Sequence, residues 1–349
     1  MVQVAGQLPV APNREAIERI EGLRGSRLVT LVLPGASLDD GCIGPLYDQL
    51  KGIGHAARLD LLIWSGGGKT ETPWRIVSLI REFCDHFGVL VPFQAHSAAT
   101  HIAVGADEIV MGPRGELSPV DPTRTHPLLP GQRDPDTGNE GPPVPTSVQD
   151  LRHCVEFVTA ELARMRHGGQ EEDQGPQVDA VPWSLHVSAS DIVRALFNRV
   201  HPLAIGAIEQ SYRLGRLITQ KMLATHLDPE ADKRKIEHVV QALSDEYRSH
   251  QYPICRREVR DDLGLNVTFA ESDLLAGMET LIGYYSQMLQ AEYREGETSG
   301  PPIPIRNVGF IDASGQRRVR RDVLDLPPEG VPRILAACWV IPPEQRPTA

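Results

Sequence analysis

Two segments decide the fold: LDLLIWSGGG, residues 59–68, and VLVPFQAHSAATHIAVGADEIVM, residues 89–111. Each begins with a short apolar run, Leu59–Trp64 or Val89–Phe93, whose length and bounding Gly, Pro or Ser are typical of a buried strand. A third apolar run, DEIVM, ends the second segment, and the small residues of Ser97–Ala106 before it suit a short buried helix. Strands that alternate with helices in this way predict a parallel sheet with right-handed crossovers.

The same pattern extends to both sides of these segments. Asn13–Gly25 has apolar residues at helical spacing, and RLVTLVL at Arg27–Leu33 reads as another buried strand. Pro73–Phe87 carries apolar residues at i, i+1, i+4, i+7, i+8 and i+11, with a proline where a first helical turn accepts one. We therefore expect one amphipathic helix over Pro73–Phe87 and an α/β core over residues 1–125.

Three further regions follow the expected core. Residues 126–147 hold many Pro, Gly and polar residues, which predicts a mobile loop. Residues 148–300 show mainly helical periodicity, and residues 301–349 form a carboxyl-terminal extension. In that extension, Asn307–Ile311 and Ile334–Val340 are predicted strands on either side of the basic stretch GQRRVRR, which we interpret as a solvated face.

Composition excludes several classes of function. The chain has 349 residues, with 35 Lys and Arg against 46 Asp and Glu, so its formal charge of −11 has the wrong sign for coating nucleic acid. No apolar run approaches about 18 residues, which predicts no membrane span. Five cysteines without CxxC pairs and an amino-terminal stretch without signal-peptide features predict the cytoplasm. No HExxH or carboxylate cluster is present, so we expect no metal and no cofactor.

The glycine-rich segment SGGGKT, residues 65–70, permits two readings. Its ending imitates a phosphate-binding P-loop, but that motif would need glycine where the chain has Ile63. With the P-loop excluded, two interpretations are left. The glycines permit a tight turn onto the next helix, or they present free amides that stabilise an anionic oxygen.

Ser97 stands where a predicted strand passes into a predicted helix. In such a position, a serine can be an ordinary N-cap. It can also be a nucleophile whose neighbouring amide, here that of Ala98, binds the oxyanion formed during acyl transfer. The small residues around Ser97 leave room for a substrate.

Taken together, LDLLIWSGGG and PFQAHSAATHIAVGADEIVMGPRGELSPVDP resemble the serine dehydrogenase proteinase family of the Clp-protease and crotonase superfamily. The resemblance extends roughly over 13–267. It implies a Clp/crotonase-like α/β fold of repeated ββα units with a largely helical carboxyl-terminal half. It also implies a serine peptidase, independent of ATP on its own, that cuts peptides or proteins. Ser97 would be its nucleophile, with an oxyanion hole formed by the amides of Gly67 or Gly68 and of Ala98.

The general base is the open question in this resemblance. Where the Clp proteolytic subunit has its catalytic histidine, this chain has Val120, which cannot take a proton. We rank His250 first because its segment resembles the one that carries the Clp triad aspartate. His101, one turn after Ser97, and Lys69, in a Ser-Lys arrangement, follow as alternative bases. His96 adjoins Ser97, and we expect it to point the other way.

The superfamily usually forms rings or stacked trimers, so we expect a homo-oligomer, with the helices of Ala189–Leu227 or Ser272–Tyr293 at the interface or as a lid. Two other functions remain open. Val120 favours a catalytically inactive scaffold or binding protein of the same fold. A crotonase-like acyl-coenzyme A enzyme would use the same two amides to hold an enolate oxygen, but nothing in the sequence matches an adenine-ribose site.

Overall fold

The computed structural model describes residues 11–133, 138–167, 194–247, 249–290, 292–295, 303–314, 316–325 and 333–341. The chain divides into two compact units, one formed by Met1–Val120 with Gly215–Ala349 and the other by Asp121–Leu214. This division differs from the expected boundaries at 125, 147 and 300. The helices after residue 215 and the carboxyl-terminal strands belong to the same unit as the α/β core, because they cover or extend its sheet.

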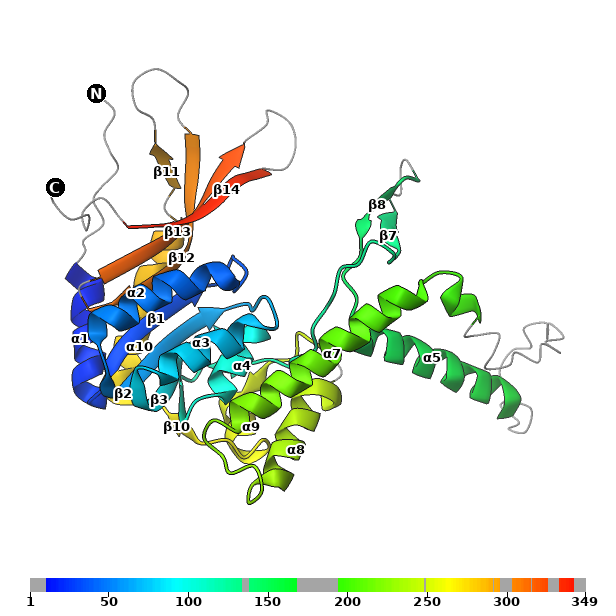
Figure 1. The fold of residues 1–349 in the computed structure, drawn as a ribbon, viewed down its shortest axis with the longest axis horizontal. Helices are drawn as coiled ribbons and strands as arrows, with labels where there is room; N and C mark the ends of the chain where they lie inside the picture. Colours follow the sequence, from blue (N-terminus) through cyan, green and yellow to red (C-terminus); the bar gives the residue numbers. More distant parts are fainter. Residues whose placement is uncertain are drawn as a thin grey trace, which may run out of the picture. The chain divides into compact units, whose positions relative to one another are not determined.

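A mixed α/β sheet forms the centre of the first unit, with the strand order β10-β5-β3-β2-β1-β12-β13-β14. Five of these strands are parallel: β1 (Arg27–Leu33), β2 (Ala56–Ser65), β3 (Cys84–Val91), β5 (Glu108–Met111) and β10 (Val267–Phe269). Beyond β1 the sheet continues with antiparallel strands: β12 (Ile303–Ala313), which also pairs with the short β11 (Glu292–Glu295), then β13 (Gln316–Asp325) and β14 (Arg333–Val340). The predicted parallel sheet is therefore present, with an antiparallel extension (Figure 1).

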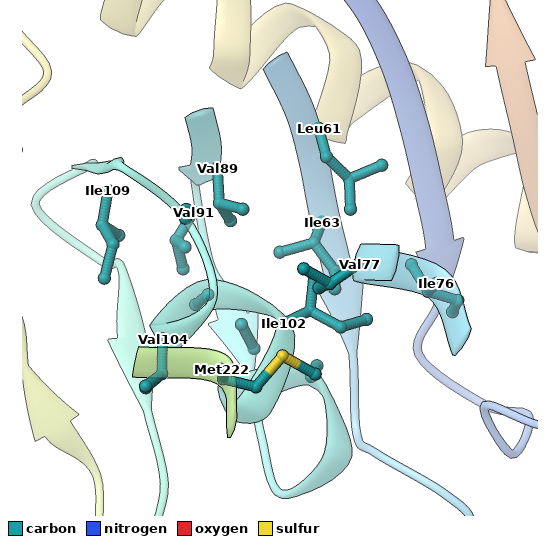
Figure 2. Packing of buried hydrophobic residues seen from close by; sticks show 14 of the residues in the cluster. Leu61, Ile63, Ile76, Val77, Val89, Val91, Ile102, Val104, Ile109 and Met222 are labelled. Atoms are coloured by element: carbon teal, nitrogen blue, oxygen red, sulfur yellow. The ribbon is translucent and has the colours of Figure 1, made fainter. Parts of the chain in front are cut away.

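Apolar side chains alternate between the two faces of the parallel strands. On β2, Leu61 and Ile63 enter one core cluster, while Leu62 enters the other. The first cluster is covered by α2 (Ile43–Ile53), α3 (Thr72–Arg81), α4 (Ala98–Val104), the end of α7 (Pro202–Leu223) and α8 (Lys233–Gln241). Figure 2 shows Ile102 of α4 and Met222 of α7 packed beneath the strands. The second cluster is covered by α1 (Ala11–Arg24) and α10 (Ser272–Gln290). Burial of both faces explains the near-continuous apolar strands.

The single helix predicted over Pro73–Phe87 is wrong. The helix α3 ends at Arg81, and β3 begins at Cys84, so that the last apolar residues of the predicted stripe lie in a strand. Phe87 is fully buried and pairs in register with Leu59 of β2. Helical spacing continued by chance across the turn between the two elements.

A small second set of strands lies beyond the carboxyl end of β2. The strand β4 (Gln94–Ala95) pairs with β2 through Ala95 and Ser65 and lies parallel to β6 (Glu116–Leu117). In turn β6 pairs antiparallel with β9 (Ile254–Cys255), which leads into α9 (Arg256–Asp261). These pairings bring residues near 95, 116 and 254 together at the end of the sheet where ligands bind in parallel α/β folds.

The interpretation of the basic stretch GQRRVRR as a solvated face is wrong. Residues 316–321 of this stretch lie in β13, and three of their guanidinium groups pair with carboxylates of other segments. Arg317 pairs with Asp312 at 3.0 Å, Arg318 with Asp48 at 3.1 Å and Arg320 with Asp39 at 3.0 Å. The acidic partners lie up to 281 residues away in the chain, where a sequence pattern does not reveal them.

The second unit holds the hairpin β7 (Gly131–Arg133) and β8 (Glu140–Pro143), the helix α5 (Val148–His167) and the first part of α7. Part of the segment predicted as a mobile loop is thus a hairpin. Of the helical segment expected to begin at Ala189, residues 189–193 lie outside the described residues, and residues 194–197 are helical. Among the described residues, no helix is both long and apolar enough to span a membrane.

Candidate active site

The backbone of Ser97 is in a conformation that non-glycine residues rarely adopt. Its φ is 52° and its ψ is −114°, and it lies between β4 and α4. A serine on a sharp strand-to-helix turn of this kind is the arrangement that exposes a nucleophilic hydroxyl in many hydrolases. The conformation costs about 1–3 kcal/mol, so the surrounding structure must hold it in place.

A short hydrogen-bond network holds this turn. The amide of Ser97 donates to Ser118 Oγ at 2.8 Å. Ser118 is itself fixed by Thr100, whose Oγ1 lies 2.9 Å from the carbonyl oxygen of Ser118 and 2.8 Å from that of Ala95. All of these contacts engage backbone atoms or neighbouring hydroxyls and leave the Ser97 side chain unused.

The N-cap reading of Ser97 is wrong. Among the described residues, the Ser97 hydroxyl makes no capping hydrogen bond to α4. A capping serine has extended φ and ψ angles and accepts a hydrogen bond from an amide of the first helical turn. Ser97 departs from that pattern in both respects and is only partly buried, so its hydroxyl is available to a ligand.

Gly67 lies directly against Ser97. A Cβ placed on Gly67 would be 2.7 Å from the Cβ of Ser97, and the φ of Gly67 is +101°, so no other residue fits there without a shift. The amide of Gly67 donates to Ser65 Oγ at 3.1 Å and is already engaged. Gly67 therefore allows the backbone to lie against Ser97, whereas its amide is not free to bind an oxyanion.

Two amides near Ser97 have no hydrogen-bond acceptor in the part of the chain that the structure describes. Leu38 accepts from the amide of Lys69 at 2.9 Å in a parallel bridge with Gly68, and because amides alternate along an extended chain, the Gly68 amide faces away from Leu38. Within the described part of the chain, the amides of Gly68 and Ala98 have no hydrogen-bond acceptor. Of the expected oxyanion donors, these two are the ones that remain available.

A cavity of about 390 Å³ lies beside this turn, lined by Gly66, His96, His250 and Gln251. The structure thus brings His250, predicted as the base, to the glycine segment and to the residue before Ser97. Its side chain is partly buried.

Sequence reasoning gave His96 no role, but the structure places it in the same cavity. His96 Nε2 lies 3.0 Å from Glu116 Oε1, and that oxygen also accepts from Gln94 Nε2 at 3.2 Å. A carboxylate on one ring nitrogen fixes the orientation of the imidazole. The contact follows from the register of β4 and β6, in which Gln94 and Glu116 are paired, and two-residue strands give no sequence signal.

The alternative bases His101 and Lys69 lie elsewhere. His101 is buried and its Nε2 donates to the carbonyl oxygen of Gly215 at 3.2 Å. Burial lowers its pKa to about 4, although the hydrogen bond to Gly215 acts in the opposite direction. Lys69 is largely exposed, with its Nζ 4.0 Å from a carboxylate oxygen of Asp40. Neither residue is among the described lining of the cavity.

Val120 is a core residue, 2% exposed, and its amide donates to the carbonyl oxygen of Leu243 at 2.9 Å. No proton acceptor therefore comes from the position that the Clp resemblance would assign to histidine. Within the described ranges, no group of three or more His, Cys, Asp or Glu side chains is gathered in a way that could hold a metal ion.

Comparison with known proteins yields structural matches only. No protein-family model matches the chain, and no curated protein matches its sequence. The ClpP protease catalytic domain from Plasmodium falciparum matches over 78% of this chain and 97% of that one, with 10% identity and a TM-score of 0.36. A ClpP1 mutant from Listeria monocytogenes matches over 74% and 98%, with 14% identity and a TM-score of 0.33.

The 1510-N membrane-bound stomatin-specific protease is also similar to this chain, over 37% of it, with 15% identity and a TM-score of 0.24. The match spans 59% of the length of that protease. Identities and TM-scores this low transfer neither an activity nor a residue role, so the candidate site must be judged on its own geometry.

Proposed function

We propose that this protein is a serine peptidase with Ser97 as its nucleophile. The observation that carries the proposal is the turn at Ser97. It combines a strained backbone, a hydroxyl without a capping role, and the adjoining amides of Gly68 and Ala98, which have no acceptor among the described residues. Strained residues and unsatisfied donors cluster at functional sites, where a ligand completes them. The motifs GADEIVMGP and LSPVDP further support kinship with the serine dehydrogenase proteinase family.

In the proposed reaction, Ser97 Oγ attacks the carbonyl carbon of a peptide while a base takes the hydroxyl proton. The carbonyl oxygen becomes negative and accepts hydrogen bonds from the amides of Gly68 and Ala98, each worth about 3–4 kcal/mol of barrier. The base then gives its proton to the leaving amine as the C–N bond breaks. A water molecule attacks the resulting acyl-enzyme by the same route and releases Ser97.

We propose His250 as this base, since it reaches the cavity beside the glycine segment. His96, which pairs with Glu116, lines the same cavity and is the second candidate. Replacing the base with alanine should lower peptide hydrolysis about 100-fold to 10,000-fold, whereas the other histidine should have a smaller effect. Comparison of His250→Ala with His96→Ala, by initial rates on a casein-derived fluorescent substrate, assigns the role.

Labelling with a fluorophosphonate probe tests the nucleophile. The wild-type chain should be labelled, and Ser97→Ala should reduce labelling at least about 100-fold, because the hydroxyl forms the bond to phosphorus. Ser249→Ala is the matched control, an exposed serine next to His250, and should be labelled like the wild type. An unlabelled wild type, or equal labelling of Ser97→Ala, would reject the peptidase.

Val120 supports a second candidate, an inactive scaffold of the same fold, because a proton acceptor is missing at that position. This candidate predicts that the wild type is not labelled. A crotonase-like enzyme would instead show a thermal shift with coenzyme A, which neither of the other two functions predicts.

We further propose that the chain forms a homo-oligomer through α7. Three leucines on this helix are exposed, Leu203 by 67%, Leu217 by 47% and Leu214 by 36%, and large exposed apolar groups are typical of contact surfaces. By contrast, α10 packs its apolar residues into the core, which argues against it as the main interface. Mass photometry should return a multiple of the 38.4 kDa chain; a monomer at micromolar concentration would contradict this.

A further inference from the structure

Arg320 of β13 connects the carboxyl-terminal strands to the loop that follows β1. Its Nη1 donates to the carbonyl oxygen of Ser37 at 3.0 Å, and its Nη2 donates to Asp39 Oδ2 at 3.0 Å. The Arg320 side chain is only 14% exposed. Two hydrogen bonds from one guanidinium, one of them to a carboxylate, fix the loop more firmly than a single surface ion pair would.

A second side chain reaches the same loop. Trp339 of β14 is paired in register with Arg320, so both side chains lie on one face of the strands. The indole nitrogen of Trp339 lies 3.6 Å from the position that a Cβ on Gly41 would take. Trp339 also packs against the core cluster that contains Leu38 and Cys42. The loop at residues 37–41 is therefore held between the core and the carboxyl-terminal strands.

This loop in turn holds the glycine segment. The amide of Leu38 donates to the carbonyl oxygen of Gly67 at 2.8 Å, and the amide of Lys69 donates to the carbonyl oxygen of Leu38 at 2.9 Å. A Cβ on Gly68 would collide with the backbone of Leu38, so the two segments are in direct backbone contact. The position of Leu38 thereby sets the direction of the Gly68 amide.

We propose that Arg320 is a positioning residue for the oxyanion-binding segment and acts through Ser37, Asp39 and Leu38 on Gly68. The inference rests on the proposed function for its catalytic consequence, but its structural part stands on the contacts above. Oxyanion donors work only when they are held in the geometry of the transition state, and a displacement of about 1 Å can cost a large factor in rate. Without Arg320, the loop would lose the two hydrogen bonds that this guanidinium donates to it.

Arg318 provides a matched control. It lies on the same strand, is 16% exposed, and pairs with Asp48 of α2 at 3.1 Å. Its hydrogen bonds to Asp48 and to the carbonyl oxygen of Arg317 do not involve the loop at residues 37–41. Arg318→Met and Arg320→Met therefore remove the same kind of ion pair from the same strand, and only the second acts on the glycine segment.

The experiment compares full-length Arg320→Met, Arg318→Met and the wild type by two measurements. Amide hydrogen exchange, read by mass spectrometry on peptides covering residues 34–42 and 64–70, should be about tenfold faster in Arg320→Met and within twofold of the wild type in Arg318→Met. The rate constant for labelling Ser97 with a fluorophosphonate, whose oxygen occupies the oxyanion site, should fall about tenfold in Arg320→Met alone. Arg320→Lys should recover part of the labelling rate, because lysine keeps the positive charge but lacks the planar guanidinium that donates two hydrogen bonds at once.

Exchange in residues 64–70 that is equal in Arg320→Met and Arg318→Met would overturn the inference. Faster exchange with a wild type that is not labelled would reject the proposed function and leave the positioning role standing. If Arg320→Met does not fold, Asp39→Asn replaces it. Asparagine can still accept from the amide of Gly41, as Asp39 Oδ1 does at 2.9 Å, while the charge opposite Arg320 is removed. Asp39→Asn should then show the faster amide exchange in residues 34–42 and 64–70. An exchange rate in residues 64–70 equal to that of the wild type would overturn the inference.

Discussion

The central sheet carries two polar clusters that differ in how completely their groups are paired. One lies in the row Leu28–Asp60–Gly88–Glu108, where Asp60 is fully buried. Asp60 accepts from Arg24 Nε at 2.9 Å and from Ser26 Oγ at 2.7 Å, while Arg24 Nη2 donates to Glu108 at 2.8 Å. Burial alone would raise the pKa of Glu108, but hydrogen bonds from Arg24 and Thr268 outweigh it and lower the pKa to about 2.

The other cluster lies at the opposite ends of the strands, after β2 and β4. Here two amides have no acceptor within the described residues, a serine hydroxyl has no capping role, and two histidines line a cavity. Both clusters bring together polar groups from distant segments, yet only in the first do all the carboxylate oxygens have hydrogen-bond donors. Paired carboxylates indicate a structural role, whereas open donors indicate a place for a ligand.

The largest loss of stability should come from a substitution in the cluster around Asp60. In Asp60→Asn, Arg24 loses one buried carboxylate partner, and removal of one partner of a buried pair costs about 3–5 kcal/mol in the free energy of unfolding. The rate of Ser97 labelling per folded molecule should not change. Urea unfolding followed by circular dichroism measures the loss.

Asp273→Asn is the control for this prediction. Asp273 pairs with Arg19 at 2.7 Å, but both side chains are mostly exposed, so the variant should lose no more than about 1 kcal/mol. Similar losses in the two variants would show that Asp60 is not a stabilising centre, and the contrast between the clusters would fail.

A second effect is expected when the pH is lowered. The pKa of His101 is lowered from 6.5 to about 4 in the folded protein, because burial disfavours its charged form. The unfolded chain therefore binds a proton that the folded one does not, and the free energy of unfolding should fall as the pH drops from 6.5 towards 4. The loss amounts to at most about 3–4 kcal/mol, at about 1.4 kcal/mol per pH unit.

The variant His101→Gln isolates this contribution, since its amide can still donate to Gly215 but does not titrate. Its unfolding free energy should be flatter between pH 6.5 and pH 4 than that of the wild type. Below about pH 4.5, the protonation of Glu108 should destabilise both proteins, because its folded pKa of about 2 lies below the ordinary value. Identical slopes above pH 4.5 would contradict the assignment to His101.

The sequence predicted those features of the fold and of the site that depend on consecutive residues. The buried strands and the position of Ser97 after a strand were predictable, because apolar runs and turn residues are written in consecutive positions. The pairing of His96 with Glu116 was not, because it depends on the register of two short strands. Nor was the place of β12 beside β1, since Leu31 and Ile311 are joined only by the folded sheet.

In the cluster at Ser97, unlike the one at Asp60, the backbone of Gly67 must lie directly against a side chain. The variant Gly67→Ala tests whether this close contact aligns Ser97. The new methyl group would lie 2.7 Å from the Cβ of Ser97 and would force an alanine into a φ of +101°. A shift of the turn by a few tenths of an ångström displaces the hydroxyl from its amides, so the labelling rate should fall about 100-fold. The free energy of unfolding should fall by only about 1–3 kcal/mol.

Gly66→Ala separates this effect from a general change in the glycine segment. A Cβ on Gly66 would come no nearer than 3.7 Å to the carbonyl oxygen of Pro34, which is an ordinary contact, and Gly66 has no positive φ. Its labelling rate should therefore stay within about tenfold of the wild type, although it lines the cavity. If the two alanine variants label equally well, close approach at Gly67 is not what aligns Ser97, and the amides alone must do so.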